Sequence, residues 1–259
     1  MAYRISVATI CFNNLDELKQ TMASVDQQAH PPYEHIIIDG STNDAIRSFL
    51  ESTSQPAYRW WLCESDEGIT DAFNKGVDHA SGEVVHLLNS GDYYYDETVL
   101  AKVQAVFDKY PEIMWTHGQY LQQVGGEWII TGSPFNPAKL YWGFGKVGHQ
   151  TMFVKKMLYE RHGYFDTSYR HSMDYDFLVR IRDEPYYYIT YPIAVFTPGG
   201  NSNINWKSGF KEVMHSYTTH IGWDIRILMG YAYQMLFNNL MQTKLGRWLL
   251  QLKYRQTKP

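Results

Sequence analysis

Short apolar runs alternate with segments of helical periodicity through the first hundred residues, and this alternation restricts the fold more than any other feature. The runs that are typical of buried strands cover residues 5–11, 35–39, 58–63 and 83–88. The segments between them predict helices over residues 15–28, 45–52 and 71–80. Strands alternating with helices predict an α/β fold, a mostly parallel sheet flanked by helices.

Acidic side chains follow three of these runs. Asp39 ends the second run, Glu64 and Asp66 follow the third, and Asp92 follows the fourth. Ligands of such sheets bind beyond the carboxyl ends of the strands, so these residues are expected at one edge. A carboxylate at a loop tip can hold a Mg²⁺-type cation against a diphosphate, because phosphates complete such sites. The pattern therefore points to nucleotide-sugar chemistry.

The rest of the chain predicts further strands and helices around an irregular segment. Strands are expected over 114–120, 128–131, 151–154 and 189–196, and helices over 97–110, 155–162 and 174–182. Residues 132–148 are rich in Gly, Pro and aromatic residues and predict a loop over the site. Residues 1–206 are interpreted as the catalytic domain, and residues 207–259 as a helical extension.

Charge is distributed unevenly along the chain, whose formal net charge is −4. Lys and Arg occupy eight positions after residue 206, against Glu212 and Asp224, so this part carries +6 and the first 206 residues carry −10. An acidic body with a basic, aromatic tail argues against a nucleic-acid-binding protein. It favours a catalytic domain whose tail approaches an anionic surface.

The tail leaves two interpretations open. Residues 227–243 are too polar and too few for a confident membrane span. Trp248, Leu249 and Leu252 are interleaved with basic residues, which suggests a helix lying in a membrane interface. The alternative is a helical cap on the core or a homodimer contact. Without a secretory signal at the N-terminus, a cytoplasmic location is expected, at the inner face of the cell membrane if the tail binds lipid.

The order of several motifs resembles family-2 glycosyltransferases, in particular their bacterial surface-polysaccharide branch. The matching blocks are residues 6–13, 37–44, 64–76, 88–92, 148–150 and 173–176. The resemblance implies a GT-A fold, a nucleotide-diphosphate sugar donor (a UDP-sugar first of all), a divalent metal, Mn²⁺ or Mg²⁺, and inversion at the anomeric carbon.

Carried over by position, the resemblance implies a donor site and a metal ligand. The implied nucleotide-sugar contacts are Thr9, Asp39, Asp66, Gly68, Asp71, Asn74 and Asn89. Asp92 takes the place of the principal metal ligand. Asn89 and Gly91 stand where carboxylates are commoner, so the metal should bind weakly without the diphosphate. The residues alone also allow Asp39 to be a turn carboxylate, and Asp71 and Asn74 to be helix caps.

The resemblance also implies a catalytic base and an acceptor side. Asp174 takes the base position, and its place at a helix start favours the anion. Asp176 is its rival but is more often structural, and Met173 stands where the family often has Glu. His149 and Gln150 are expected on the acceptor side, although a loop histidine with a purely structural role fits as well.

These expectations combine into one hypothesis. The chain is expected to be a metal-dependent, inverting hexosyltransferase-type enzyme in which Asp39, Asp92 and Asp174 converge on one pocket and Asp174 acts as base. Its acceptor is expected to be a saccharide or a lipid-linked saccharide. Nucleotidyl transfer is disfavoured because residues 9–15 contain neither glycine nor Lys or Arg. The alternative is a catalytically weak or inactive sugar-nucleotide-binding or scaffold protein.

Overall fold

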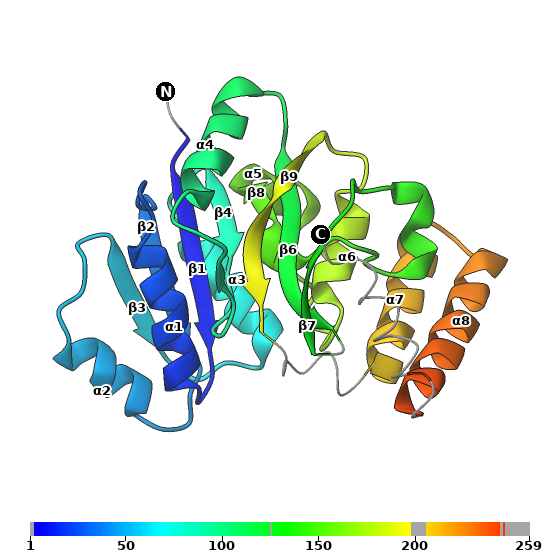
Figure 1. Cartoon of the computed structure of the whole chain (residues 1–259), viewed down its shortest axis with the longest axis horizontal. Coiled ribbons are helices and arrows are strands. Elements are labelled where there is room, and N and C mark those ends of the chain that lie inside the picture. Colours follow the sequence, from blue (N-terminus) through cyan, green and yellow to red (C-terminus); the bar gives the residue numbers. More distant parts are fainter. Residues whose placement is uncertain (1–2, 125, 198–205, 244–245, 247–259) are drawn as a thin grey trace.

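One nine-stranded sheet organises the molecule (Figure 1). The computed structural model describes residues 3–124, 126–197, 206–243 and 246. The strand order is β3-β2-β1-β4-β8-β6-β9-β5, and β7 pairs with β6 outside this path. The predicted α/β class is therefore confirmed.

The N-terminal half follows the predicted alternation closely. Its elements are β1 (Ile5–Cys11), α1 (Leu15–Asp26), β2 (Glu34–Asp39), α2 (Ala45–Ser52), β3 (Arg59–Cys63), α3 (Ile69–His79) and β4 (Val84–Leu87). The pairs β1–β2, β2–β3 and β1–β4 are all parallel. The register aligns Cys11 with Asp39 and Asp39 with Cys63, so these strands end level at one edge.

The second half of the sheet is mixed. Its strands are β5 (Tyr93–Tyr94), β6 (Trp115–Val124), β7 (Glu127–Thr131), β8 (Phe153–Lys155) and β9 (Tyr186–Phe196). Its helices are α4 (Val99–Lys109), α5 (Lys156–His162), α6 (Met173–Arg180), α7 (Trp206–His220) and α8 (Ile225–Gln242), with 3-10 turns η1 (Pro137–Trp142) and η2 (His149–Thr151). Strand β8 runs antiparallel to both β4 and β6, whereas β6 and β9 are parallel. The two-residue strand β5 was not predicted, because so short a run has no readable periodicity.

Helices cover both faces of the parallel strands, which explains why β1 and β2 are buried at every residue. On one face, Ala8 of β1 packs in the same apolar cluster as Phe73 and Val77 of α3. On the other face, Cys11 packs with Leu18 of α1. Helix α3 approaches β1 closely at Gly76, where an added Cβ would lie 3.0 Å from the Ala8 Cβ.

Carboxylates attach α7 to α6 and to the segment before it. The Glu212 carboxylate accepts hydrogen bonds from the backbone N–H groups of Arg170, His171 and Ser172, at 3.2, 2.9 and 2.9 Å. Buried Asp176 accepts from Ser216 Oγ of α7 at 2.8 Å and pairs with Arg180 Nε at 2.9 Å. Asp176 therefore joins two helices, as expected for the structural rival of Asp174. The domain boundary at residues 206/207 stays a prediction.

Helix α8 packs on η1 and α7 at the end of the molecule opposite β3 (Figure 1). Within the described ranges, no helix combines the length and the apolar character that crossing a membrane requires.

Replacing Asp176 with Ala should destabilise the protein by about 3–5 kcal/mol, because Arg180 would keep a buried charge without its partner. Urea unfolding followed by circular dichroism measures the change. Asp183→Ala is the matched control, since that carboxylate is 83% exposed beside Arg182 and should shift stability by less than about 0.5 kcal/mol. Equal stability of the two variants would contradict a structural role for Asp176.

Candidate active site

The turn that follows β4 is fixed by Thr21 of α1. The backbone N–H of Asp92 donates to the Asn89 carbonyl at 3.0 Å, closing the turn over residues 89–92. Thr21 Oγ1 donates to the Asp92 carbonyl at 2.7 Å and accepts from the Gly91 N–H at 3.0 Å. Gly91 adopts φ +99°, which a side chain would strain. Asp92 is thereby held at a defined place beyond the end of β4.

The Asp92 side chain is almost completely buried, with 6% of its surface exposed. Its Oδ1 accepts a hydrogen bond from the Thr197 backbone N–H at 3.3 Å. Burial raises the pKa of Asp92 to about 7, because the low-dielectric surroundings disfavour the anion, while the Thr197 bond opposes this shift. Among the described residues, no positive charge contributes to the pKa of this carboxylate in favour of its ionised form.

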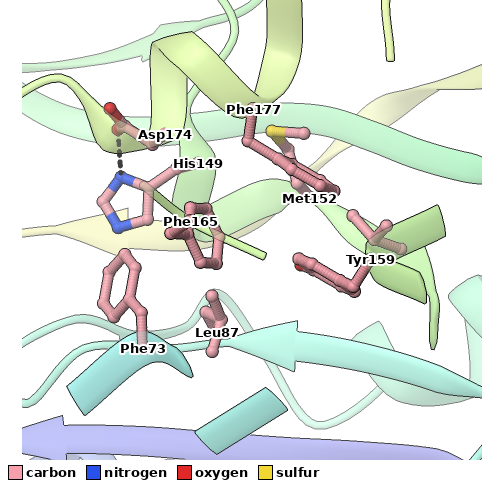
Figure 2. Close-up of a pocket in the computed structure, with 9 residues that line it drawn as sticks. Phe73, Leu87, His149, Met152, Tyr159, Phe165, Asp174 and Phe177 are labelled. Carbon is pink, nitrogen blue, oxygen red and sulfur yellow. Dashed lines mark ion pairs between the residues drawn. The ribbon is translucent and has the colours of Figure 1, made fainter. Parts of the chain in front are cut away.

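His149 connects the turn after β4 with the start of α6. Its Nε2 lies 3.1 Å from Asn89 Nδ2, and its Nδ1 lies 3.4 Å from Asp174 Oδ2 (Figure 2). Burial lowers the pKa of His149, so the ring is neutral at neutral pH. A neutral ring with its proton on Nδ1 presents N–H to Asp174 and accepts from Asn89 at Nε2.

Asp174 sits in the first turn of α6 with about a quarter of its side chain exposed. Burial raises the pKa of Asp174, while His149 and the Tyr175 backbone N–H, 2.8 Å from Oδ1, act in the opposite direction. The carboxylate is therefore more basic than a free aspartate.

Two cavities meet at His149 and Asp174. The first, of about 20 Å³, is small and mainly apolar, with Phe73, Phe165 and Phe177 among its walls (Figure 2). The second is an open cleft of about 290 Å³. Its other lining residues are Tyr120, Gln122, Phe144, Gly145, Val147, Gly148, Gln150, His171, Ser172, Tyr175, Phe196 and Val213. Asp174 is thus a carboxylate in the wall of a cleft large enough for a sugar-sized ligand.

Asp39 and Asp66 come together near the carboxyl end of β2. Asp39 is 3% exposed, and its Oδ1 accepts from the Ser41 N–H at 3.0 Å. Asp66 Oδ1 accepts from the Gly68 N–H at 2.9 Å. A Cβ at Gly40 would lie 1.8 Å from Asp66 Oδ2, so only glycine leaves room for the Asp66 carboxylate beside Asp39.

Thr9 lies inside the sheet layer. Its side chain has no exposed surface, and its hydroxyl lies 2.9 Å from His35 Nε2. His35 Nδ1 in turn accepts from Arg59 Nε at 3.0 Å. In this structure the Thr9 side chain cannot touch a ligand directly, so a role in nucleotide binding would be indirect.

Three predicted donor-site residues belong to α3 or directly precede it. Gly68, at φ +117°, precedes the first turn of the helix. Asp71 accepts from the Glu67 N–H at 3.2 Å and pairs with Lys75 at 3.3 Å. The Asn74 amide donates to and accepts from the Phe165 backbone, both at 2.9 Å. Asn74 is therefore not the helix cap that the sequence also allowed, because both polar atoms of its amide bind the Phe165 backbone.

The structure therefore brings Asn89, His149, Gln150 and Asp174 together. Other predicted site residues do not line the same cavities. Asp39 and Asp92 line neither of the two cavities that Asp174 lines. The expected convergence of Asp39, Asp92 and Asp174 on one pocket is not seen in these cavities. Tyr120, Gln122 and His171 in the cleft wall were missed, because no local pattern marks residues that only tertiary packing brings to a cleft.

The turn after β4 fits a metal ion that takes most of its ligands from a bound diphosphate. In the part of the chain that the structure describes, no group of three or more His, Cys, Asp or Glu residues could hold a metal by itself. Asn89 Oδ1 is buried there without a hydrogen-bond partner, and Asp92 ends the same turn. Two oxygen ligands of this kind leave most of a hard cation's coordination shell to a diphosphate and water.

Comparison with known proteins identifies the class. The glycosyl transferase family 2 profile matches residues 6–164, and the chain belongs to this family. An uncharacterised glycosyltransferase of Mycobacterium tuberculosis strain H37Rv is 35% identical over 179 residues, 68% of each chain. The family predicted from the motifs is therefore confirmed.

Solved structures confirm the GT-A fold. Residues 1–349 of TarS from S. aureus superpose with a TM-score of 0.66 at 14% identity, over 93% of this chain and 75% of that one. TarS has also been solved with UDP-GlcNAc. A mannosyltransferase from Pyrobaculum calidifontis, in complex with GDP-Man and Mn²⁺, has a TM-score of 0.60 at 16% identity, over 98% and 85%.

Asp92→Asn should stabilise the metal-free protein at pH 8. The folded pKa of about 7 lies above the ordinary value of 3.8, so the neutral carboxyl favours folding at low pH and this advantage is lost as pH rises toward 7. Removing the charge should raise the free energy of unfolding by on the order of 3 kcal/mol at pH 8 and by much less at pH 5. Thermal unfolding at both pH values measures the effect. A variant that is destabilised equally at both would contradict the buried, unpaired state of Asp92, and Asp183→Asn serves as the exposed control.

Proposed function

We propose that this protein is an inverting glycosyltransferase. It transfers a hexose-type sugar from a nucleoside-diphosphate sugar, a UDP-sugar first of all, to a hydroxyl of a saccharide or lipid-linked saccharide in bacterial surface-polysaccharide assembly. The observation that carries the proposal is Asp174, a carboxylate of raised pKa that lies against His149 in the wall of an open cleft.

The reaction is a single displacement. The acceptor oxygen attacks the anomeric carbon opposite the leaving diphosphate, so one carbon–oxygen bond forms while the bond to the diphosphate breaks, and Asp174 takes the acceptor proton. A base with a raised pKa accepts a proton more readily near neutral pH than a free aspartate does. Gln150 and His149 also line the cleft. We assign both residues to the acceptor side in this proposal.

Asp92 and Asn89 are the residues that would hold Mn²⁺ or Mg²⁺. When bound, the cation would neutralise charge on the departing diphosphate. Asn89 has a second role in this proposal, because its Nδ2 contacts His149 while its Oδ1 has no partner among the described residues. Donor binding at the turn would in this way fix the orientation of the histidine that lies against the base.

Asp39 and Asp66 are proposed to contact the base or ribose of the donor. They lie together beside Gly40, near the carboxyl end of β2. Gly68 and Asp71 would act mainly by shaping the start of α3, and Asn74 by holding the Phe165 backbone against this helix. The TarS complex with UDP-GlcNAc and the mannosyltransferase complex with GDP-Man and Mn²⁺ support a nucleotide-sugar donor and a divalent cation.

One observation favours a second candidate, a sugar-nucleotide-binding protein with weak or no catalysis. Asp92 is the single carboxylate of the turn over residues 89–92. Asn89 and Gly91 stand at the positions where carboxylates are commoner in the family. Such a protein would bind the donor with no turnover under any divalent metal.

Asp174→Asn should lower kcat by about 10²–10⁴-fold, because the acceptor hydroxyl loses its base. Donor affinity, measured as the thermal shift produced by UDP, GDP, dTDP or CDP with Mn²⁺, should stay near that of the unchanged protein. Asp183→Asn is the control for loss of one carboxylate. Unchanged turnover in Asp174→Asn would exclude this base, and binding without turnover in the unchanged protein would favour the second candidate.

The pH profile should report the contact between His149 and Asp174. Activity requires ionised Asp174, so kcat/KM should fall as pH drops through its raised pKa. The Nδ1–H that the neutral His149 ring presents to Asp174 stabilises the carboxylate and lowers the pKa of Asp174, so His149→Leu, which removes this N–H, should move the acid limb to higher pH. Initial rates at saturating Mn²⁺ measure the shift. An acid limb that stays in place would show that His149 does not act on the base.

A further inference from the structure

Helix α8 has two apolar faces, of which one is used within the protein. On the inner face Ile227 is fully buried, and the Tyr231 and Phe210 rings lie 5.4 Å apart. Gly230 allows a close approach to η1, since an added Cβ would lie 2.4 Å from the Tyr141 carbonyl oxygen. These contacts attach the helix to the catalytic part of the chain.

The other face of α8 is apolar and exposed. Ile225, Met229, Leu236 and Leu240 recur at spacings that place them on one side of the helix, with exposed fractions of 55%, 61%, 71% and 40%. Trp223, in the turn before the helix, is 71% exposed. We call these five residues the outer face of α8. Large exposed apolar side chains that lie together mark a surface that binds a protein, a membrane or a ligand.

The charge of residues 225–259 indicates which kind of partner the outer face of α8 binds. Residues 225–259 contain no Asp or Glu, and Lys or Arg stand at positions 226, 244, 247, 253, 255 and 258. A second copy of this chain carries the same positive charges in this part of its sequence, and like charges repel. Anionic lipid headgroups attract such segments instead.

We propose that the outer face of α8 docks the protein on an anionic phospholipid bilayer, to which the basic residues of the sequence after α8 are attracted. The helix lies in the headgroup region with its apolar residues toward the acyl chains, as amphipathic surface helices do. Among the described residues no helix could span a bilayer, so this contact is on the membrane surface. Figure 1 shows α8 at one end of the molecule, where it can meet such a surface.

The docking surface lies beside the acceptor cleft. Trp142 of η1 and Tyr233 of α8 have ring centroids 5.1 Å apart, and Arg226 lies 5.2 Å from the Tyr141 ring. The residues that directly follow η1, including Phe144 and Gly145, line the cleft. A bilayer at α8 would therefore present a lipid-linked acceptor close to Asp174, and this last step rests on the proposed function.

Sedimentation of the purified full chain with phosphatidylcholine vesicles, with or without phosphatidylglycerol, tests the proposal. The protein should sediment with the anionic vesicles, and less so at high salt. Met229→Glu with Leu236→Glu should lower the bound fraction about tenfold or more, since both side chains would have to leave lipid. The control pair, Ile130→Glu with Met157→Glu, alters side chains of similar exposure, 52% and 45%, elsewhere on the surface and should bind normally.

A second variant, with Gln at positions 244, 247, 253, 255 and 258, leaves α8 intact and should lose the salt-dependent part of the binding. Absence of binding to anionic vesicles would overturn the proposal. So would unchanged binding by Met229→Glu with Leu236→Glu, or a dimer in light scattering that this pair dissociates without any vesicle binding.

Transfer to a water-soluble acceptor separates this inference from the proposed function. The Met229→Glu and Leu236→Glu pair should keep that activity. Failure of the unchanged protein to transfer sugar would contradict the proposed function and leave the vesicle result standing.

Discussion

The position of His149 between Asn89 and Asp174 depends on one arrangement of strands. Strand β4 pairs with β1 in parallel and with β8 in antiparallel orientation. The first pairing brings Asn89 to the edge where the parallel strands end, and the second brings η2, which directly precedes β8, alongside the end of β4. Because His149 opens η2, its ring lies between the turn after β4 and the first turn of α6. Three segments that are remote in sequence thus meet at one half-buried side chain.

Burial acts on each ionisable group of this site. It raises the pKa of Asp92 and of Asp174 and lowers that of His149. A neutral histidine between an amide and a carboxylate costs little in such surroundings, whereas an isolated anion at Asp92 is unfavourable. In the proposed function these surroundings would suit Asp92 to binding a cation and Asp174 to accepting a proton.

The helices after β9 mainly support the site, although Val213 of α7 also lines the cleft. Glu212 of α7 binds three backbone N–H groups immediately before α6, and Asp176 of α6 is held by α7. The position of Asp174 thus depends on α7 through the backbone that precedes it. Helix α8 extends the same support through η1 to the residues that line the cleft. In the part of the chain that the structure describes, the outer face of α8 stays exposed.

The amino-acid sequence by itself determined the strands β1 to β4 with their helices, the α/β class and the family. Apolar runs of strand length and helical periodicity are local patterns, and the blocks around Asp39, Asp92 and Asp174 stand in a recognisable order. Tertiary structure decided which of these residues share a cavity. Thr9 and Asn74 look like candidates for a ligand in the sequence, yet their polar atoms contact His35 and Phe165. The short strand β5, the cleft wall and the His149 contacts arise from pairings between distant segments. No local pattern encodes such pairings, because their free energy comes from burial against residues elsewhere in the chain.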